Sequence, residues 1–114
     1  MHYKKIIIVE GKSDRQQIKR VIDEEVDIIC TYGTFSISYF DELLDRYDLD
    51  HRDVYIFVDE DDSGLELRKE LARELPHAHH IRVSSDYKEV EIAPLDEIAY
   101  ALLSQNIAVD SRFL

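Results

Sequence analysis

Two short apolar runs, each followed directly by acidic residues, most restrict what this chain can fold into. Residues 6–9 (IIIV) precede Glu10, and residues 54–58 (VYIFV) precede four consecutive acids at positions 59–62. Continuous runs of β-branched and aromatic residues are typical of strands that are buried on both faces. We therefore expect a parallel sheet with helices on both faces and acidic residues at the ends of two strands.

Helical patterns alternate with these strands along the chain. Weaker strand patterns occupy residues 26–30 and 80–83, and a last helix is expected from Pro94. The apolar residues at helical spacing are Ile18, Val21 and Ile22, then Ile37, Phe40, Leu43, Leu44 and Tyr47, then Leu67, Leu71 and Leu75. The expected helix caps are Ser13 or Asp14, Ser36, and Asp62 or Ser63. This order of elements predicts an α/β fold with right-handed crossovers.

Composition restricts the class of protein further. The chain has 114 residues, with 25 acidic against 14 basic side chains and a formal net charge of −11. Its length and 45% hydrophobic content predict a single domain over residues 1–114. A surface this acidic weighs against binding nucleic acid by charge alone, because that mode needs clustered Lys and Arg. Any contact with phosphate must therefore be local or bridged by a metal.

Cysteine content and apolar run length bear on the compartment. A single cysteine, Cys30, cannot form an intramolecular disulfide, which is typical of proteins in a reducing cytosol. The longest apolar run, residues 98–103, is far shorter than the ~20 residues that span a bilayer. We expect a cytoplasmic protein that makes no contact with a membrane.

The acids at the two strand ends form a pattern suited to a metal. Asp59 and Asp61 are two positions apart, so both side chains project to the same side if the strand geometry continues. Gly64 permits a tight turn into the following helix. Glu10 joins this pair if the first and third strands are neighbours. Three carboxylates around one point suit Mg²⁺ or Mn²⁺, which also leave coordination positions for phosphates.

These segments together resemble a Toprim domain, a unit of topoisomerases, bacterial primases and several nucleases. The resemblance rests on the Glu-Gly step of residues 6–14 (IIIVEGKSD), on Gly33-Thr34, and on the Asp-x-Asp-x-x-Gly step of residues 58–64 (VDEDDSG). It is closest to small stand-alone Toprim proteins and to the ribosomal RNA maturase type. It implies a three-layer, Rossmann-like α/β/α fold with a four-stranded, mainly parallel sheet in the order 2-1-3-4. The core would span about residues 3–90, with a C-terminal helix at 94–105.

The resemblance also implies roles for individual residues. Glu10 matches the acid/base glutamate of the family and, with Asp59 and Asp61, its metal ligands, while Lys12 follows the glutamate where it could hold a phosphate. The expected supporting residues are Gly11, Asp14, Gly33, Asp62 and Gly64, with Lys88 and Glu89 at the edge of the site. The implied activity is Mg²⁺-dependent phosphodiester or phosphoryl-transfer chemistry on nucleic acid, nuclease-like or primase-like. The alternative is an inactive metal-binding module that acts through a protein partner, for which a basic protein is the candidate.

Three other motifs compete for the same residues. Gly11, Lys12 and Ser13 copy the end of a nucleotide-binding P-loop, but Ile6 stands where that loop needs a glycine. Asp59, Asp61, Ser63, Gly64 and Glu70 match positions of an EF-hand calcium loop, although such a loop follows a helix and here a strand is expected. A phosphoacceptor receiver domain would need two acids after the first strand. A calcium-binding or phosphoacceptor signalling domain is therefore kept as a third reading.

Overall fold

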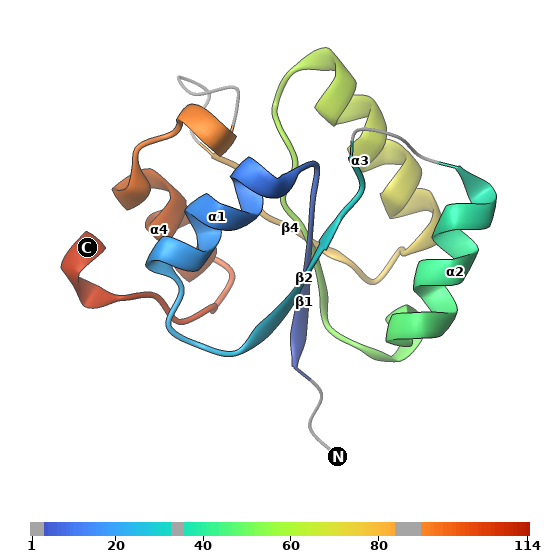
Figure 1. Cartoon of the computed structure of the whole chain (residues 1–114), viewed down its shortest axis with the longest axis horizontal. Coiled ribbons are helices and arrows are strands. Elements are labelled where there is room, and N and C mark those ends of the chain that lie inside the picture. The colour runs from blue at the N-terminus through green and yellow to red at the C-terminus, as the bar shows by residue number, and fades with distance from the viewer. Residues whose placement is uncertain (1–3, 33–35, 84–89) are drawn as a thin grey trace.

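The computed structural model of this protein describes residues 4–32, 36–83 and 90–114, and it places one sheet between two layers of helices (Figure 1). The strands of the described residues are β1 (Lys5–Val9), β2 (Val26–Cys30), β3 (Val54–Ile56) and β4 (His79–His80). They form a sheet in the order β2-β1-β3-β4, and every pair is parallel. The predicted α/β/α architecture and strand order are confirmed.

Helices cover the sheet on both faces. They are α1 (Lys12–Val21), α2 (Ile37–Tyr47), α3 (Asp62–Glu74) and α4 (Leu95–Leu103), and three short 3₁₀ turns lie at Leu49–His51, Val90–Ile92 and Ser111–Phe113. In Figure 1, α1 and α4 lie on one side of the sheet and α2 and α3 on the other. Among the described helices, none combines the length and apolar composition that crossing a bilayer requires.

The apolar strand residues divide between two cores because successive side chains in a strand point to opposite faces. Ile7, Val9, Tyr55 and Phe57 pack with residues of α1 and α4. Ile6, Ile8, Val54 and Ile56 pack with residues of α2 and α3. Continuous apolar runs, rather than alternating ones, are what a sheet covered on both faces requires.

Strands β3 and β4 are shorter than the sequence predicts. The expected strands covered residues 54–58 and 80–83, but the ladder between them ends near Ile56. The guanidinium of Arg68, in α3, accounts for this, since it donates to the backbone carbonyls of Ile56 (3.1 Å), Val58 (3.3 Å) and Ile81 (3.0 Å). Arg68 thus satisfies the Val58 and Ile81 carbonyls, which a longer ladder would have paired, while the Ile56 carbonyl also accepts from the Ile81 N–H at 2.9 Å.

The helix starts agree with the sequence in part. Ser36 caps α2 as predicted, accepting from the Tyr39 N–H at 3.2 Å. The cap of α3 is Asp61 rather than Asp62 or Ser63, and the cap position of α1 is Gly11 rather than Ser13 or Asp14. The last helix is shorter than residues 94–105 and ends at Leu103. Asp61 therefore belongs both to the acidic strand end and to a helix cap.

The parallel pairing of β1 with β3 sets the position of the acids. The register aligns Ile8 with Ile56, and β1 lies between β2 and β3. Because parallel strands end at the same edge of a sheet, the residues that follow β1 and β3 meet there. The sheet brings Glu10 and Asp59 to one edge, as the sequence predicts.

Truncating a core leucine of α3 should destabilise the fold much more than truncating an exposed one. Leu71 is 1% exposed in the core against β1 and β3, whereas Leu103 in α4 is 42% exposed. We expect Leu71→Ala to lower the free energy of unfolding by about 2–5 kcal/mol, and Leu103→Ala by less than about 1 kcal/mol. Urea unfolding followed by circular dichroism measures both values, and equal losses would contradict the described packing.

Candidate metal centre

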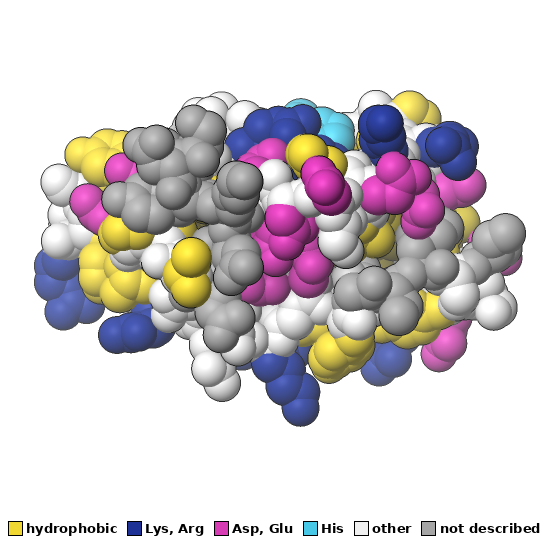
Figure 2. Space-filling model, turned by 90° about the horizontal axis from the view of Figure 1, so that it is seen from above, with side chains coloured by type: hydrophobic (Ala, Val, Ile, Leu, Met, Phe, Trp, Pro, Cys, Tyr) yellow, Lys and Arg dark blue, Asp and Glu magenta, His cyan; other side chains and the backbone are white. Residues whose placement is uncertain are grey.

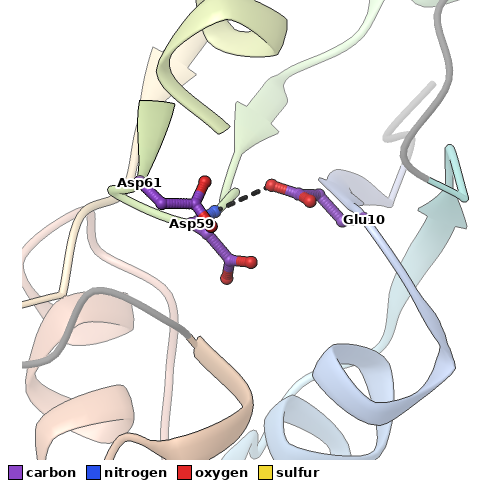
Figure 3. A group of neighbouring side chains, drawn as sticks. All are labelled: Glu10, Asp59 and Asp61. Atoms are coloured by element: carbon purple, nitrogen blue, oxygen red, sulfur yellow. Dashed lines mark hydrogen bonds between the residues drawn. The ribbon is translucent and has the colours of Figure 1, made fainter. Parts of the chain in front are cut away.

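Three carboxylates meet at the carboxyl edge of the sheet (Figure 3). Glu10 directly follows β1, Asp59 follows the buried stretch beyond β3, and Asp61 caps α3. One oxygen from each lies within 4.8 Å of the others, and each residue is partly buried. The three residues that the sequence singled out as metal ligands are thus neighbours in space.

Backbone N–H groups hold each of these carboxylates in place. The Asp59 N–H donates to Glu10 Oε1 (3.1 Å), the Val90 N–H to Asp59 Oδ1 (2.9 Å), and the Gly64 N–H to Asp61 Oδ1 (2.8 Å). Within the described part of the chain, the second oxygen of each group has no hydrogen-bond partner. The arrangement fixes three side chains while it leaves one oxygen of each for a ligand.

Gly64 is the glycine that this geometry requires. A Cβ at this position would lie 2.1 Å from the Asp59 carbonyl oxygen and 3.0 Å from Glu10 Oε1. A side chain here would push the start of α3 away from the segment that carries Asp59. Gly11 differs, because its φ of −148° suits any residue and a Cβ there would meet only Asp14 Oδ2, at 3.9 Å.

The electrostatics of the site favour a cation. Burial raises the pKa of Glu10, and the charges of Asp61 and Asp14 add to the effect against the opposing hydrogen bond from Asp59. Burial, followed by the charges of Glu10, Asp14 and Asp61, likewise raises the pKa of Asp59 to about 6, although the Val90 N–H opposes the shift. Among the described residues, no Lys or Arg forms an ion pair with the three carboxylates.

A divalent cation fits this donor set. Oxygen atoms within 4.8 Å of one another can belong to one coordination sphere, because hard cations bind oxygen at about 2.0–2.6 Å. The charge of such a cation would offset both the cost of burying these carboxylates and the smaller repulsion among them, which together raise the pKa values of Glu10 and Asp59. Glu10, Asp59 and Asp61 are the residues that could hold it.

The other predicted site residues differ in where they lie: one supports the start of a helix, two are exposed, and three are outside the described residues. Asp14 is 7% exposed and accepts from the Gly11 N–H at 3.0 Å, so it supports the start of α1. Lys12 is exposed at the first position of α1 and Asp62 at the first position of α3. Neither forms an ion pair with the three carboxylates within the described ranges. Gly33, Lys88 and Glu89 lie outside the described residues.

The calcium-loop reading is wrong. An EF-hand loop follows a helix, whereas Asp59 follows strand β3. The remaining positions of the motif, from Ser63 to Glu70, lie inside α3 instead of in an open loop. The cap segment and the first turns of α3 carry residues at the spacing of an EF-hand loop, but they do not have the open-loop geometry of that motif.

Sequence reasoning missed an ion-pair network beside the acids. Glu60 accepts from Arg68 (3.2 Å) and from Arg82 (3.0 Å), and Arg68 is 3% exposed. The sequence signal was the position of Arg68, which falls between Leu67 and Leu71 on the apolar stripe of α3. A charged residue on such a stripe must find buried partners, here the carbonyls beyond β3 and β4.

The protein is a three-layer α/β protein with an acidic cluster at the carboxyl edge of its parallel sheet, and this class of protein is suited to holding a divalent cation. Residues 5–93 match the family model of the Toprim domain, and the chain belongs to the Toprim family. A solved structure of a small TOPRIM domain protein from Bacillus stearothermophilus superimposes with a TM-score of 0.90 at 38% identity, over 99% of this chain and 94% of that one.

Two further relatives frame the comparison. The protein named Uncharacterized protein YusF, from Bacillus subtilis (strain 168), is 50% identical over 111 residues, which are 96% of this chain and 74% of that protein. Ribonuclease M5 1 from Ligilactobacillus salivarius (strain UCC118) is 35% identical over 81 residues, which are 70% of this chain and 42% of that enzyme. The chain therefore spans less than half the length of this ribonuclease.

A side chain at Gly64 should be far less tolerated than one at Gly11. We expect Gly64→Ala to lower the free energy of unfolding by about 3 kcal/mol or more, because the added Cβ overlaps the Asp59 carbonyl. Gly11→Ala, the matched control, should cost at most about 1 kcal/mol, the loss associated with a poorer cap residue. Urea unfolding of both variants measures the difference, and similar costs would contradict the close approach of α3 to Asp59.

The metal-free protein should lose stability as pH rises through the range in which Asp59 ionises. The pKa of Asp59 is about 6 in the folded protein against an ordinary value of 3.8, so proton binding favours the folded state. This stabilisation is complete below about pH 4 and is lost as pH rises through about 6. Its size is on the order of 1 kcal/mol once solvent screening of this partly exposed group is allowed for.

Urea unfolding in a chelator between pH 4 and pH 8 tests this dependence. Asp59→Asn keeps an oxygen to accept from the Val90 N–H but carries no charge, so its stability should fall less with pH than that of the wild type. Asp62→Asn removes an exposed acid beside the cluster and should leave the profile as in the wild type. A profile for Asp59→Asn that follows the wild type would refute the assignment of the raised pKa.

Proposed function

We propose that this chain is a single Toprim domain that binds Mg²⁺ or Mn²⁺ and catalyses metal-dependent cleavage of phosphodiester bonds in RNA. The observation that carries the proposal is the meeting of Glu10, Asp59 and Asp61 at the carboxyl edge of the sheet, each fixed by a backbone N–H. Carboxylate oxygens alone, with no nitrogen or sulfur ligand, suit these hard cations.

Each carboxylate has a defined part in this proposal. Asp59 and Asp61 would hold the cation, and Glu10 would contribute to the site from the end of the neighbouring strand, β1. The bound cation would neutralise charge that develops on the phosphoryl oxygens. Fixed side chains favour this chemistry because little reorganisation is then needed as the reaction proceeds.

Glu10 is suited to move a proton as well as to bind. Its Oε1 accepts from the Asp59 N–H, so Oε2 is the atom at which a proton can be taken up or released. Burial raises the pKa of Glu10 toward the range in which a carboxyl group is an effective general base or acid. We assign to Glu10 the proton transfer to or from the nucleophile or leaving group.

RNA is the substrate that the relatives favour, because several of them are named ribonuclease M5. Lys12, which stands two residues after Glu10 at the start of α1, would contact a phosphate of that substrate near the N-terminus of the helix. A net charge of −11 leaves such local contacts as the means of holding a polyanion.

A second candidate function is that of a metal-binding module that acts through a protein partner. The match to ribonuclease M5 1 covers 42% of that enzyme, so more than half of the relative has no counterpart in the matched region. In that enzyme, the part outside the match would be available to hold the substrate. In this case a basic partner would carry the nucleic acid to the acidic edge.

Neutralising the three carboxylates should remove activity, whereas neutralising a neighbour should not. We expect Glu10→Gln to slow Mg²⁺-dependent RNA cleavage by about 10²–10⁴-fold, because the amide cannot transfer a proton. Asp59→Asn and Asp61→Asn should lose cleavage together with Mg²⁺ and Mn²⁺ binding, measured by calorimetry. Asp62→Asn, the exposed neighbour, should retain wild-type cleavage and binding.

The outcomes separate the two candidate functions. Metal binding by the wild type with no cleavage of any structured or single-stranded RNA would favour the partner module. Cleavage by the Asp59→Asn and Asp61→Asn variants at the wild-type rate would contradict the site itself.

A further inference from the structure

A groove with basic walls lies between α3 and β4 on a chain that is otherwise strongly acidic. It has a volume of about 350 Å³ and is lined by Leu65, Arg68, Lys69, Ala72, His80 and Arg82. Three of these residues are permanent cations, in a protein whose net charge is −11. Figure 2, which looks onto the carboxyl edge of the sheet, shows Lys, Arg and His side chains along one rim and acidic side chains near the centre.

The positive charge of this groove is only partly neutralised within the described residues. Glu60 pairs with Arg68 at 3.2 Å and with Arg82 at 3.0 Å, so one acid faces two guanidinium groups. Lys69 is exposed and has no ion pair among the described residues. Burial, and after it the charge of Arg82, lower the pKa of Arg68 to about 10, although Glu60 opposes the shift.

Polar groups of the groove also have unused donors. The Nε–H of Arg68 has no acceptor in the described structure, but it is buried, so Arg68 contributes charge to the groove rather than an accessible donor. The guanidinium of Arg82, with its side chain 52% exposed, uses one nitrogen on Glu60 and has others that face no acceptor among the described residues. Arg68 also contacts His80 Nδ1 at 3.0 Å, and burial, followed by the charges of Arg68 and Arg82, lowers the pKa of His80. The groove thus offers donors and positive charge, which is the chemistry that recognises phosphate.

We propose that this groove binds a backbone phosphate of the same RNA strand whose reacting phosphate lies at Glu10, Asp59 and Asp61. The proposal rests on the function proposed above. Its basis is continuity, since Glu60 lies in the chain between Asp59 and Asp61 and pairs with the cations of the groove. A strand held by its reacting phosphate at the metal centre must place a neighbouring phosphate somewhere. The groove supplies at this edge the cations that the acidic centre lacks.

Two exposed cations make the proposal testable without disturbing the fold. The double variant Lys69→Gln/Arg82→Gln removes two positive charges from the groove and leaves buried Arg68 in place. Lys19→Gln/Arg20→Gln removes two exposed charges from the last turn of α1, which lies toward the opposite edge of the sheet. Lys69→Arg/Arg82→Lys keeps the charge of the groove and controls for shape.

The measurement is the affinity for a labelled single-stranded RNA of about ten nucleotides at several salt concentrations, by fluorescence anisotropy, in Ca²⁺ and in a chelator. We expect the groove variant to bind about tenfold more weakly and its slope of log affinity against log salt to shrink by about 0.7, the contribution of the one phosphate that the groove would bind. The α1 variant and the charge-keeping variant should match the wild type.

The possible outcomes distinguish this proposal from the proposed function. Equal losses in the groove and α1 variants, or no measurable RNA binding by the wild type, would overturn it. Displacement of the RNA by a polyglutamate peptide at equal charge concentration would also overturn it, because it would indicate an acidic protein as the ligand. If Asp59→Asn leaves cleavage intact but the groove variant still loses affinity, the proposed metal site fails while the groove proposal stands.

Discussion

The site depends on one constraint: backbone N–H groups hold three carboxylates together although their charges repel one another. Parallel pairing of β1 with β3 forces Glu10 and Asp59 to one edge, and the cap of α3 adds Asp61. Each carboxylate accepts one backbone hydrogen bond, so none can turn away without leaving a donor unpaired. The free energy of folding therefore maintains a concentration of negative charge that a bound cation can relieve.

An ion-pair network of Glu60, Arg68 and Arg82 supports the three carboxylates. Arg68 donates to the Val58 and Ile81 carbonyls, which lie beyond β3 and β4, and to Glu60, so it fixes the segment that carries Asp59 where the pairing of the two strands ends. This side chain has a structural part in the interior and lines the groove at the surface. Because cations lie beside the acids rather than among them, the edge keeps both a place for a metal and a place for an anion.

The sequence predicted those features of the protein that have a signature in neighbouring residues. Two apolar runs indicated strands buried on both faces, and the acids that follow them indicated Glu10, Asp59 and Asp61. The hydrogen bond from Val90 to Asp59, 31 residues apart, has no local signature, and neither has the pairing of Arg68 with Glu60. Likewise, the two motif glycines look equivalent in sequence. Only the approach of α3 to the Asp59 carbonyl shows that, of the two glycines Gly11 and Gly64 that the structure describes, Gly64 is the one that is sterically required.

The central claim is that these three carboxylates form a metal site, and anomalous diffraction from crystals grown or soaked in Mn²⁺ tests it most directly. The account predicts a strong anomalous peak coordinated by one oxygen from each of Glu10, Asp59 and Asp61, with their backbone hydrogen bonds retained. A peak located elsewhere, or no peak at this edge of the sheet at saturating Mn²⁺, would contradict it.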